Sequence, residues 1–420
     1  MEIGVRAFLA RLPERIWFRL AIYTALALVL VAFSWGLGGH LPEAFGFPLA
    51  QGAVQSVLEV LASSMLAVTT FSLTAMISAY GSAARGTTPR ATQLLISDRT
   101  SQNALSTFLG AFVFAILGIV VLGVDGLTDQ ARGLLFIGAI LMTALVVGTL
   151  LHWIHHLTTF GRVPDVIDRV ERAATDAARA YARDPHLGGV APVAVPDGAR
   201  VVRATLAGSV TRVDVPLLES IAAEEGIEIH VDAIPGSYVG KGSALARITG
   251  GGPSSDDAEA WERLRGAFLV ERHRTYEQDP RLGLVALAEI GSRALSPSTN
   301  DPGTAVEALG ASERVLTVLL TAEADSECDC PRVHVPAVAF EDLVEDVLRP
   351  IARDGAPLVE VGLRVQKVLV HLVALAPDQA HRDVLFAASS RAVERAEAAL
   401  SHPSDLAAVR AAADTVFAAE

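Results

Sequence analysis

The sequence predicts a membrane protein of the α-helical class: four transmembrane helices, followed by a cytoplasmic α+β region with a small β-barrel-like domain and a helical domain. Three observations support this class. The mean hydropathy of +0.41 is high for a chain of 420 residues. Four stretches of at least 18 residues lack Asp, Glu, Lys and Arg, and they cover residues 20–37, 60–84, 104–124 and 133–160. The charge is also uneven, because 26 of 34 basic and 40 of 47 acidic residues follow residue 159, a net charge of −14 there.

Each uncharged stretch is long enough to cross a bilayer. A helix rises about 1.5 Å per residue and the hydrocarbon core is about 30 Å thick. A single such stretch could be a buried helix of a soluble domain, but four within 160 residues favour membrane spans. The first stretch is longer than a signal-peptide core, and three more follow it, so we expect it to be retained.

The arginines predict the orientation of the spans. Ten of them flank the cytoplasmic side of the predicted topology: four before the first span, three between spans two and three, and three after the fourth. The other two loops carry Arg132 alone. Because basic residues concentrate in cytoplasmic loops, both termini are predicted to be cytoplasmic.

Four regions are expected along the chain: the transmembrane domain (1–160), an amphipathic connecting helix (161–198), a small β-rich barrel-like domain (199–250) and a helical domain (251–420). Within the third, residues 200–205, 227–233 and 244–249 have strand patterns, and 217–225 a helical one. A short strand is expected at 332–337. The remaining helices are expected at 258–274, 281–295, 302–322, 340–353, 357–375, 378–399 and 403–418.

The barrel expectation comes from residues 235–248, PGSYVGKGSALARI, which are similar to the turn-and-strand pattern of biotinyl/lipoyl-type small barrels. In those barrels a lysine on a hairpin carries the cofactor. Lys241 instead lies within the glycine turn, so we predict a structural barrel and no cofactor.

Residues 293–305, RALSPSTNDPGTA, join two predicted helices and are dense in hydroxyl and amide groups. Pro297 ends the first helix, Asp301 can cap the second, and Pro302 suits its first position. Capping does not explain the whole polar run. A structural junction and a binding or interface role therefore both remain open.

The run from residue 274 to 306, RTYEQDPRLGLVALAEIGSRALSPSTNDPGTAV, resembles the signature of the bacterial predicted membrane proteins called domain of unknown function 2254. The resemblance extends to residues 70–90, 98–114 and 208–248. It implies a bacterial cytoplasmic (inner) membrane protein without a settled activity. The candidate site residues carried by this motif are Arg274, Gln278, Asp279, Ser296, Pro297, Asn300, Asp301, Pro302 and Thr304.

The second span carries a polar stripe. At 100° per residue, its small and polar residues fall within about 100° of one helix face. The candidate residues are Ser56, Glu59, Ser63, Thr70, Thr74 and Ser78. Such a stripe is typical of close helix packing and also of a lined pathway. Glu59 favours the pathway, because a membrane carboxylate usually faces protein or water and would form a cation-attracting ring in a homo-oligomer.

No metal site, cofactor or enzyme is predicted. His152, His155 and His156 share helical spacing without a carboxylate nearby in sequence, and Cys328 and Cys330, with His334, lack further ligands. No catalytic motif is found. The acidic C-terminal part disfavours nucleic acid, leaving the lipid bilayer and a second copy as expected partners. Two functions remain: an oligomeric ion channel or transporter, and a membrane-anchored scaffold or sensor for a partner or small ligand.

Overall fold

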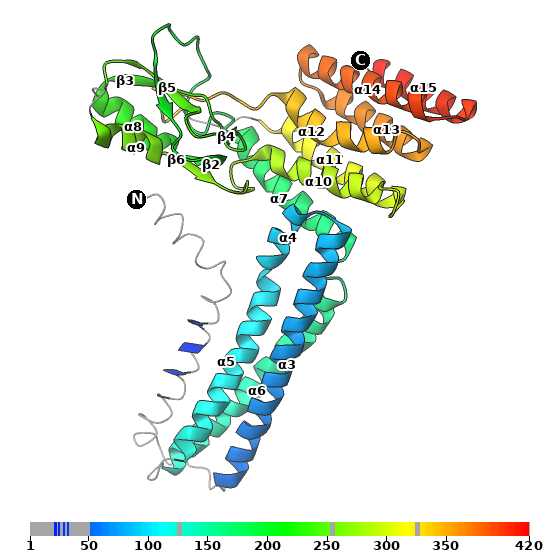
Figure 1. The fold of residues 1–420 in the computed structure, drawn as a ribbon. Coiled ribbons are helices and arrows are strands. Elements are labelled where there is room, and N and C mark those ends of the chain that lie inside the picture. Colours follow the sequence, from blue (N-terminus) through cyan, green and yellow to red (C-terminus); the bar gives the residue numbers. More distant parts are fainter. Residues whose placement is uncertain are drawn as a thin grey trace. The chain divides into compact units, whose positions relative to one another are not determined.

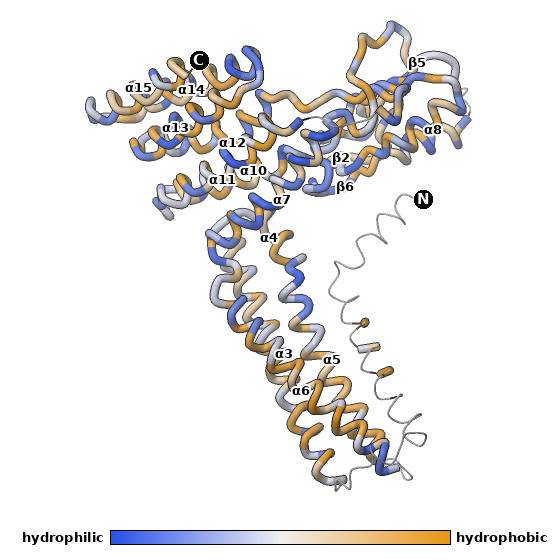
Figure 2. Tube along the Cα trace, turned by 180° about the vertical axis from the view of Figure 1, so that it is seen from behind, coloured by the Kyte–Doolittle hydropathy of each residue, from blue (hydrophilic) through white to orange (hydrophobic). Residues whose placement is uncertain are grey.

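Three long apolar helices follow one another in the computed structural model of the chain. They are α3 (Gln51–Gly86), α5 (Arg99–Leu122) and α6 (Asp129–Leu157). Each is long and apolar enough to cross a membrane. Figure 2 shows hydrophobic residues along most of their length. The structure describes residues 51–123, 128–252, 257–323 and 328–419, and seven helical positions between 21 and 32. The predicted first span therefore lies mostly outside the described residues.

Two compact units make up the chain. Of the described residues, the span unit contains those up to 85 and those from 92 to 165, and the C-terminal unit contains residues 86–91 and those from 166 onward. The short helix α4 (Pro89–Ile96) follows α3 directly, so the boundary between the units falls within it.

Small residues let the helices of the span unit approach closely. A Cβ atom at Gly118 on α5 would lie 2.9 Å from the Leu58 side chain on α3. Gly138 on α6 likewise receives the ring of Phe114. Between α3 and α6, the buried Trp153 indole donates a hydrogen bond of 3.0 Å to Ser72 Oγ. In lipid, such steric fit and interhelical hydrogen bonds replace hydrophobic burial as the cause of association.

The C-terminal unit begins with most of α7 (Val163–Arg183), which buries one apolar face that includes Val166, Val170 and Ala174. Its contact with α10 (Pro280–Ala294) is close, because a Cβ atom at Gly283 would overlap Ala174. An amphipathic connecting helix was expected within residues 161–198; α7 covers the first part of that range and packs into this unit.

The strands form two open sheets and no closed barrel, so the small barrel-like domain expected from the sequence is not confirmed. The first has the order β1-β5-β3-β7 and the second β4-β2-β6. Their bounds are β1 Arg200–Arg203, β2 Gly208–Val213, β3 Ile227–Val231, β4 Tyr238–Val239, β5 Ala244–Gly250, β6 Phe268–Glu271 and β7 Val333–His334. The last two strands come from outside residues 199–250. Because β6 pairs with β2 and β7 pairs in parallel with β3, long-range pairing completes both sheets.

One apolar core joins the strands to two helices, α8 (Val215–Glu225) and α9 (Ala258–Gly266). Ile229 on β3 and Leu218 on α8 are fully buried in it. The helix expected over 258–274 is shorter than predicted, since it ends at Gly266 and β6 begins at Phe268.

The rest of the C-terminal unit is helical (Figure 1), and its helices agree with the expected ranges to within two residues at each end. After α10 come α11 (Pro302–Thr321), α12 (Phe340–Asp354), α13 (Val359–Leu375), α14 (Gln379–Ala399) and α15 (Pro403–Phe417). Close approach at Gly291 to Ile351 and at Gly362 to Val409 brings neighbouring helices together.

Candidate functional site

The helix α3 packs with one face only. Its buried residues include Leu58, Met65, Ser72 and Met76, all with at most 4% exposure. At 100° per residue these positions lie about 160–200° from Ser56. The face that contacts α5 and α6 is therefore opposite the polar stripe predicted from the sequence.

All six stripe residues are exposed in the described structure: Ser56, Glu59, Ser63, Thr70, Thr74 and Ser78. Three hydroxyls donate to carbonyls of the same helix, from Ser63 to Val60, from Thr70 to Leu66 and from Thr74 to Thr70. Such bonds satisfy a hydroxyl in an apolar environment. The stripe therefore tolerates lipid, a second helix or water.

Large apolar side chains accompany the stripe. Val60, Phe71 and Ile77 are each at least 60% exposed, on or beside the same face. Glu59 accepts a hydrogen bond of 2.8 Å from Gln55 one helical turn earlier. The exposed face of α3 is thus mixed, with polar groups spaced between apolar ones.

The first half of the motif lies where the β-sheets meet α10. Asp279, only 1% exposed, accepts two hydrogen bonds from Arg274, of 2.6 and 2.8 Å. It also caps α10 by accepting from the amides of Arg281 and Leu282. Gln278 Oε1 accepts from the Val213 amide of β2 at 3.0 Å. These residues tie the sheet region to the helical region.

Nearly three turns further along α10, Glu289 binds the segment that directly follows α3. Its carboxylate accepts a hydrogen bond from Thr88 and pairs with Arg90. Tyr276 lies in the same environment, and its pKa is raised by burial first and then by the charge of Glu289. Sequence reasoning gave no role to Glu289 or Thr88, because only the fold brings residues about 200 positions apart together.

The second half of the motif is an exposed connection between α10 and α11. Asp301 caps α11 through the Thr304 amide (3.1 Å) and hydroxyl (2.6 Å), which lower the pKa of Asp301. Pro302 begins α11, and Asn300 has a positive φ of 48°. Ser296 bonds within the connection, and Pro297 is exposed beside it. In the described structure these groups do not pack inward, unlike Asp279.

An open groove of about 600 Å³ runs between α10 and α12 in the C-terminal unit. Arg281 lies across it and pairs with Asp346 at 2.7 Å and Asp342 at 2.9 Å. Its charged lining consists of five carboxylates and three arginines. Such a lining suits a small charged ligand better than an apolar one.

The histidines of the fourth predicted span separate in the structure. His152 and His155 are exposed, whereas His156 Nε2 lies 3.0 Å from Asp98 Oδ2. Asp98 also caps α5 through the Ser101 amide. The sequence shows no carboxylate near these histidines. In the structure Asp98, which lies 58 residues earlier in the chain than His156, supplies one. Cys330 is buried and Cys328 exposed, and burial raises the pKa of the Cys330 thiol.

Long apolar helices followed by an α+β unit are the features expected of a membrane protein. The model of one family matches residues 13–371, which include both α3 and the motif around α10. The chain belongs to this family, described as predicted membrane protein (DUF2254).

The curated relatives are mycobacterial. An uncharacterized protein of Mycobacterium bovis and another of Mycobacterium tuberculosis are each 24% identical over 294 residues, covering 67% of this chain and 55% of theirs. This chain thus spans about half the length of the curated relatives that it matches. No solved structure matches it.

Proposed function

We propose that the chain forms a homo-oligomeric channel or transporter in the bacterial cytoplasmic membrane, with α3 lining the path and both termini in the cytoplasm. One observation carries the proposal: the polar face of α3 is exposed, while the opposite face packs on α5 and α6. A second copy of the chain could cover that face and enclose water between its polar groups. Glu59 would then contribute one carboxylate per subunit near the outer end, favouring cations.

Glu289 accepts a hydrogen bond from Thr88 and forms an ion pair with Arg90, and these contacts support a gating role for the C-terminal unit. These two residues directly follow α3 in the chain. A rearrangement of α10 would therefore act on the end of α3 through a short covalent connection. Gating of this kind requires a two-state element that both parts bias.

The alternative is a membrane-anchored scaffold or sensor. The charged groove beside α10 favours it, because Arg281 and its carboxylate partners could rearrange around a small ionic ligand. In that case α3 would pack against another copy without enclosing water, as small and hydroxyl residues often do.

Cysteine accessibility separates the two functions. After replacement of Cys328 and Cys330 by serine, single cysteines at Ser63, Thr70 and Thr74 should react with small water-soluble thiol reagents. Leu66 and Leu73 are matched controls, because they are 53% and 47% exposed in the single chain yet should face lipid. Equal protection of all five cysteines would indicate that the polar face of α3 packs against another helix and lines no water-filled path.

Ion flux in liposomes tests conduction directly. The purified chain should pass small cations, and Glu59→Gln should reduce the preference for cations over anions. Gln55→Ala is the control, since it removes the neighbour of Glu59 and keeps the charge. Liposomes that stay tight with every ion, together with protected cysteines, would reject the channel in favour of the scaffold or sensor.

A further inference from the structure

We propose that Glu228, His230 and His334 bind a divalent transition-metal ion of the zinc type, in a site separate from α3 and from the motif around α10. The three residues come from two strands of one sheet. His230 on β3 is the register partner of His334 on β7, so their side chains are neighbours on the same face. Glu228 lies two residues before His230, which places it on that face as well.

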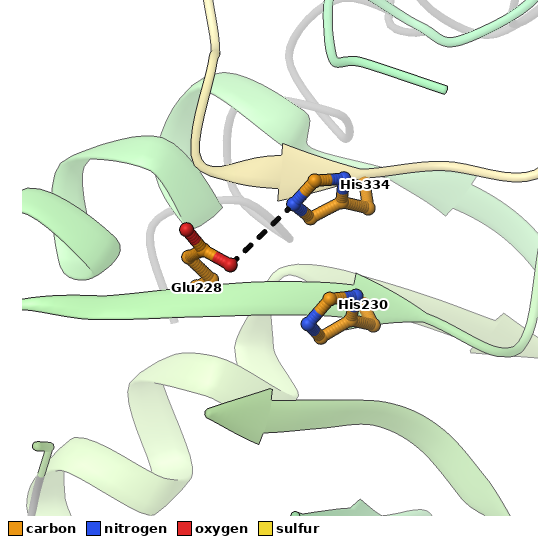
Figure 3. Close-up of side chains that lie close together, drawn as sticks. All are labelled: Glu228, His230 and His334. Atoms are coloured by element: carbon orange, nitrogen blue, oxygen red, sulfur yellow. Dashed lines mark ion pairs between the residues drawn. The ribbon is translucent and has the colours of Figure 1, made fainter. Parts of the chain in front are cut away.

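The side chains are grouped tightly. One ligand atom from each residue lies within 4.8 Å of the others. Glu228 Oε2 is 3.8 Å from His334 Nε2, and the two imidazole rings stack with centroids 4.6 Å apart at 8°. Figure 3 shows the rings one above the other, with the Glu228 carboxylate beside the outer nitrogen of His334. Donors around a tetrahedral zinc with bonds of about 2.0–2.1 Å stand about 3.3 Å apart, so the ligand atoms must move closer together to share one ion.

The hydrogen bonds prepare His334 as a ligand. Its Nδ1 lies 3.0 Å from the carbonyl oxygen of Ala191, which can only accept. The proton therefore sits on Nδ1 and leaves the Nε2 lone pair free toward Glu228. A backbone carbonyl on the second nitrogen is the usual arrangement behind a metal-binding histidine.

The buried ring of His230 has an unpaired nitrogen that a ligand would satisfy. It is 5% exposed, its Nδ1 has no hydrogen-bond partner in the described structure, and its Nε2 has only a 3.4 Å contact with Thr249. Buried polar groups in native proteins are nearly always paired.

Metal binding would change the arrangement of the rings. A metal–nitrogen bond lies in the imidazole plane, so two parallel stacked rings cannot both point at one ion. Each ring must turn about its Cβ–Cγ bond until the lone pairs converge. Two histidines and one carboxylate leave a fourth position open, and the ion would fix the two-residue strand β7 onto β3.

Metal titration of the full-length, tag-free chain in detergent tests the site. Zinc binding would be followed by competition with a chromophoric chelator, and cobalt(II) by its visible spectrum. We expect one ion per chain and a tetrahedral cobalt spectrum without thiolate charge transfer. Glu228→Gln and His334→Gln should each weaken binding at least tenfold. His402→Gln, on an exposed histidine, is the matched control and should leave the affinity unchanged.

Glu228→Gln keeps the test decisive if His334→Gln fails to fold, because the Glu228 side chain is 61% exposed. Unchanged affinity in Glu228→Gln, or the absence of stoichiometric binding, would overturn the proposal. A thiolate band that disappears in Cys328→Ser/Cys330→Ser would also overturn it, by assigning the metal to the cysteines.

Discussion

Gly236 and Asp279 lie so close together that a Cβ atom on Gly236 would stand 2.8 Å from each carboxylate oxygen of Asp279. Gly236 belongs to the turn before β4 and has a φ of +91°. The absence of a side chain there lets the turn pack against the buried Arg274–Asp279 ion pair. The contact joins the sheet region to the start of α10.

Gly236→Ala should therefore destabilise the chain by more than the cost of placing alanine at a positive φ, because the new Cβ atom would also collide with Asp279. Gly198→Ala is a matched control, because Gly198 has the same φ of +91° and nothing within 4 Å of its Cβ position. The control should cost about 1–2 kcal/mol, and Gly236→Ala clearly more, as measured by the urea midpoint in detergent. Equal midpoints would mean that the Asp279 side chain moves aside freely.

Asp279 and Asp301 both cap helices, yet their substitution should differ in effect. Asp279→Ala leaves Arg274 without its buried partner and should cost about 3–5 kcal/mol. The Asp301 side chain is exposed and bonds only to Thr304 within its own turn, so Asp301→Ala should cost about 1 kcal/mol. A much larger cost at Asp301 would indicate that its connection packs against another chain, as the sequence motif allows.

Two partly buried tyrosines form a matched pair for substitution by phenylalanine. The Tyr276 hydroxyl has no partner in the described structure, whereas the Tyr181 hydroxyl donates to Val338 O and accepts from Val338 N. Tyr276→Phe should thus be neutral or slightly stabilising at pH 7, and Tyr181→Phe should cost about 1 kcal/mol. Thermal unfolding of both variants checks this, and a loss of stability in Tyr276→Phe would contradict it.

The same tyrosine predicts a pH dependence. The pKa of Tyr276 in the folded state is raised above its usual value near 10. Above pH 10 the unfolded chain releases this proton while the folded chain keeps it, so stability falls as the pH rises. Tyr276→Phe should flatten that alkaline decline without changing the slope between pH 6 and 9. An unchanged decline would show that other groups cause it.

Membrane topology is testable with impermeant thiol reagents on intact cells. In a chain without Cys328 and Cys330, a cysteine at Asp129 should label, because the loop before α6 is predicted to face outward. A cysteine at the exposed Ser404 on α15 should stay protected until the cells are lysed. The reverse pattern would contradict the ten-to-one arginine bias.

Elements whose causes are local could be predicted from the residues alone. Uncharged stretches marked the apolar helices α3, α5 and α6, because length and composition decide whether a helix can cross lipid. Pro302 and Asp301 marked the start of α11 for the same local reason. The family motif also followed from residues near one another in the chain.

Features that depend on contacts between distant residues could not be predicted and are seen only in the folded chain. The strands were expected to close a barrel, but β6 and β7 joined them from outside residues 199–250 and completed two open sheets. Pairing His230 with His334 or Glu289 with Thr88 requires contacts across more than 100 residues. Periodicity reports which face of a strand or helix is apolar, and it carries no information about which partner that face meets.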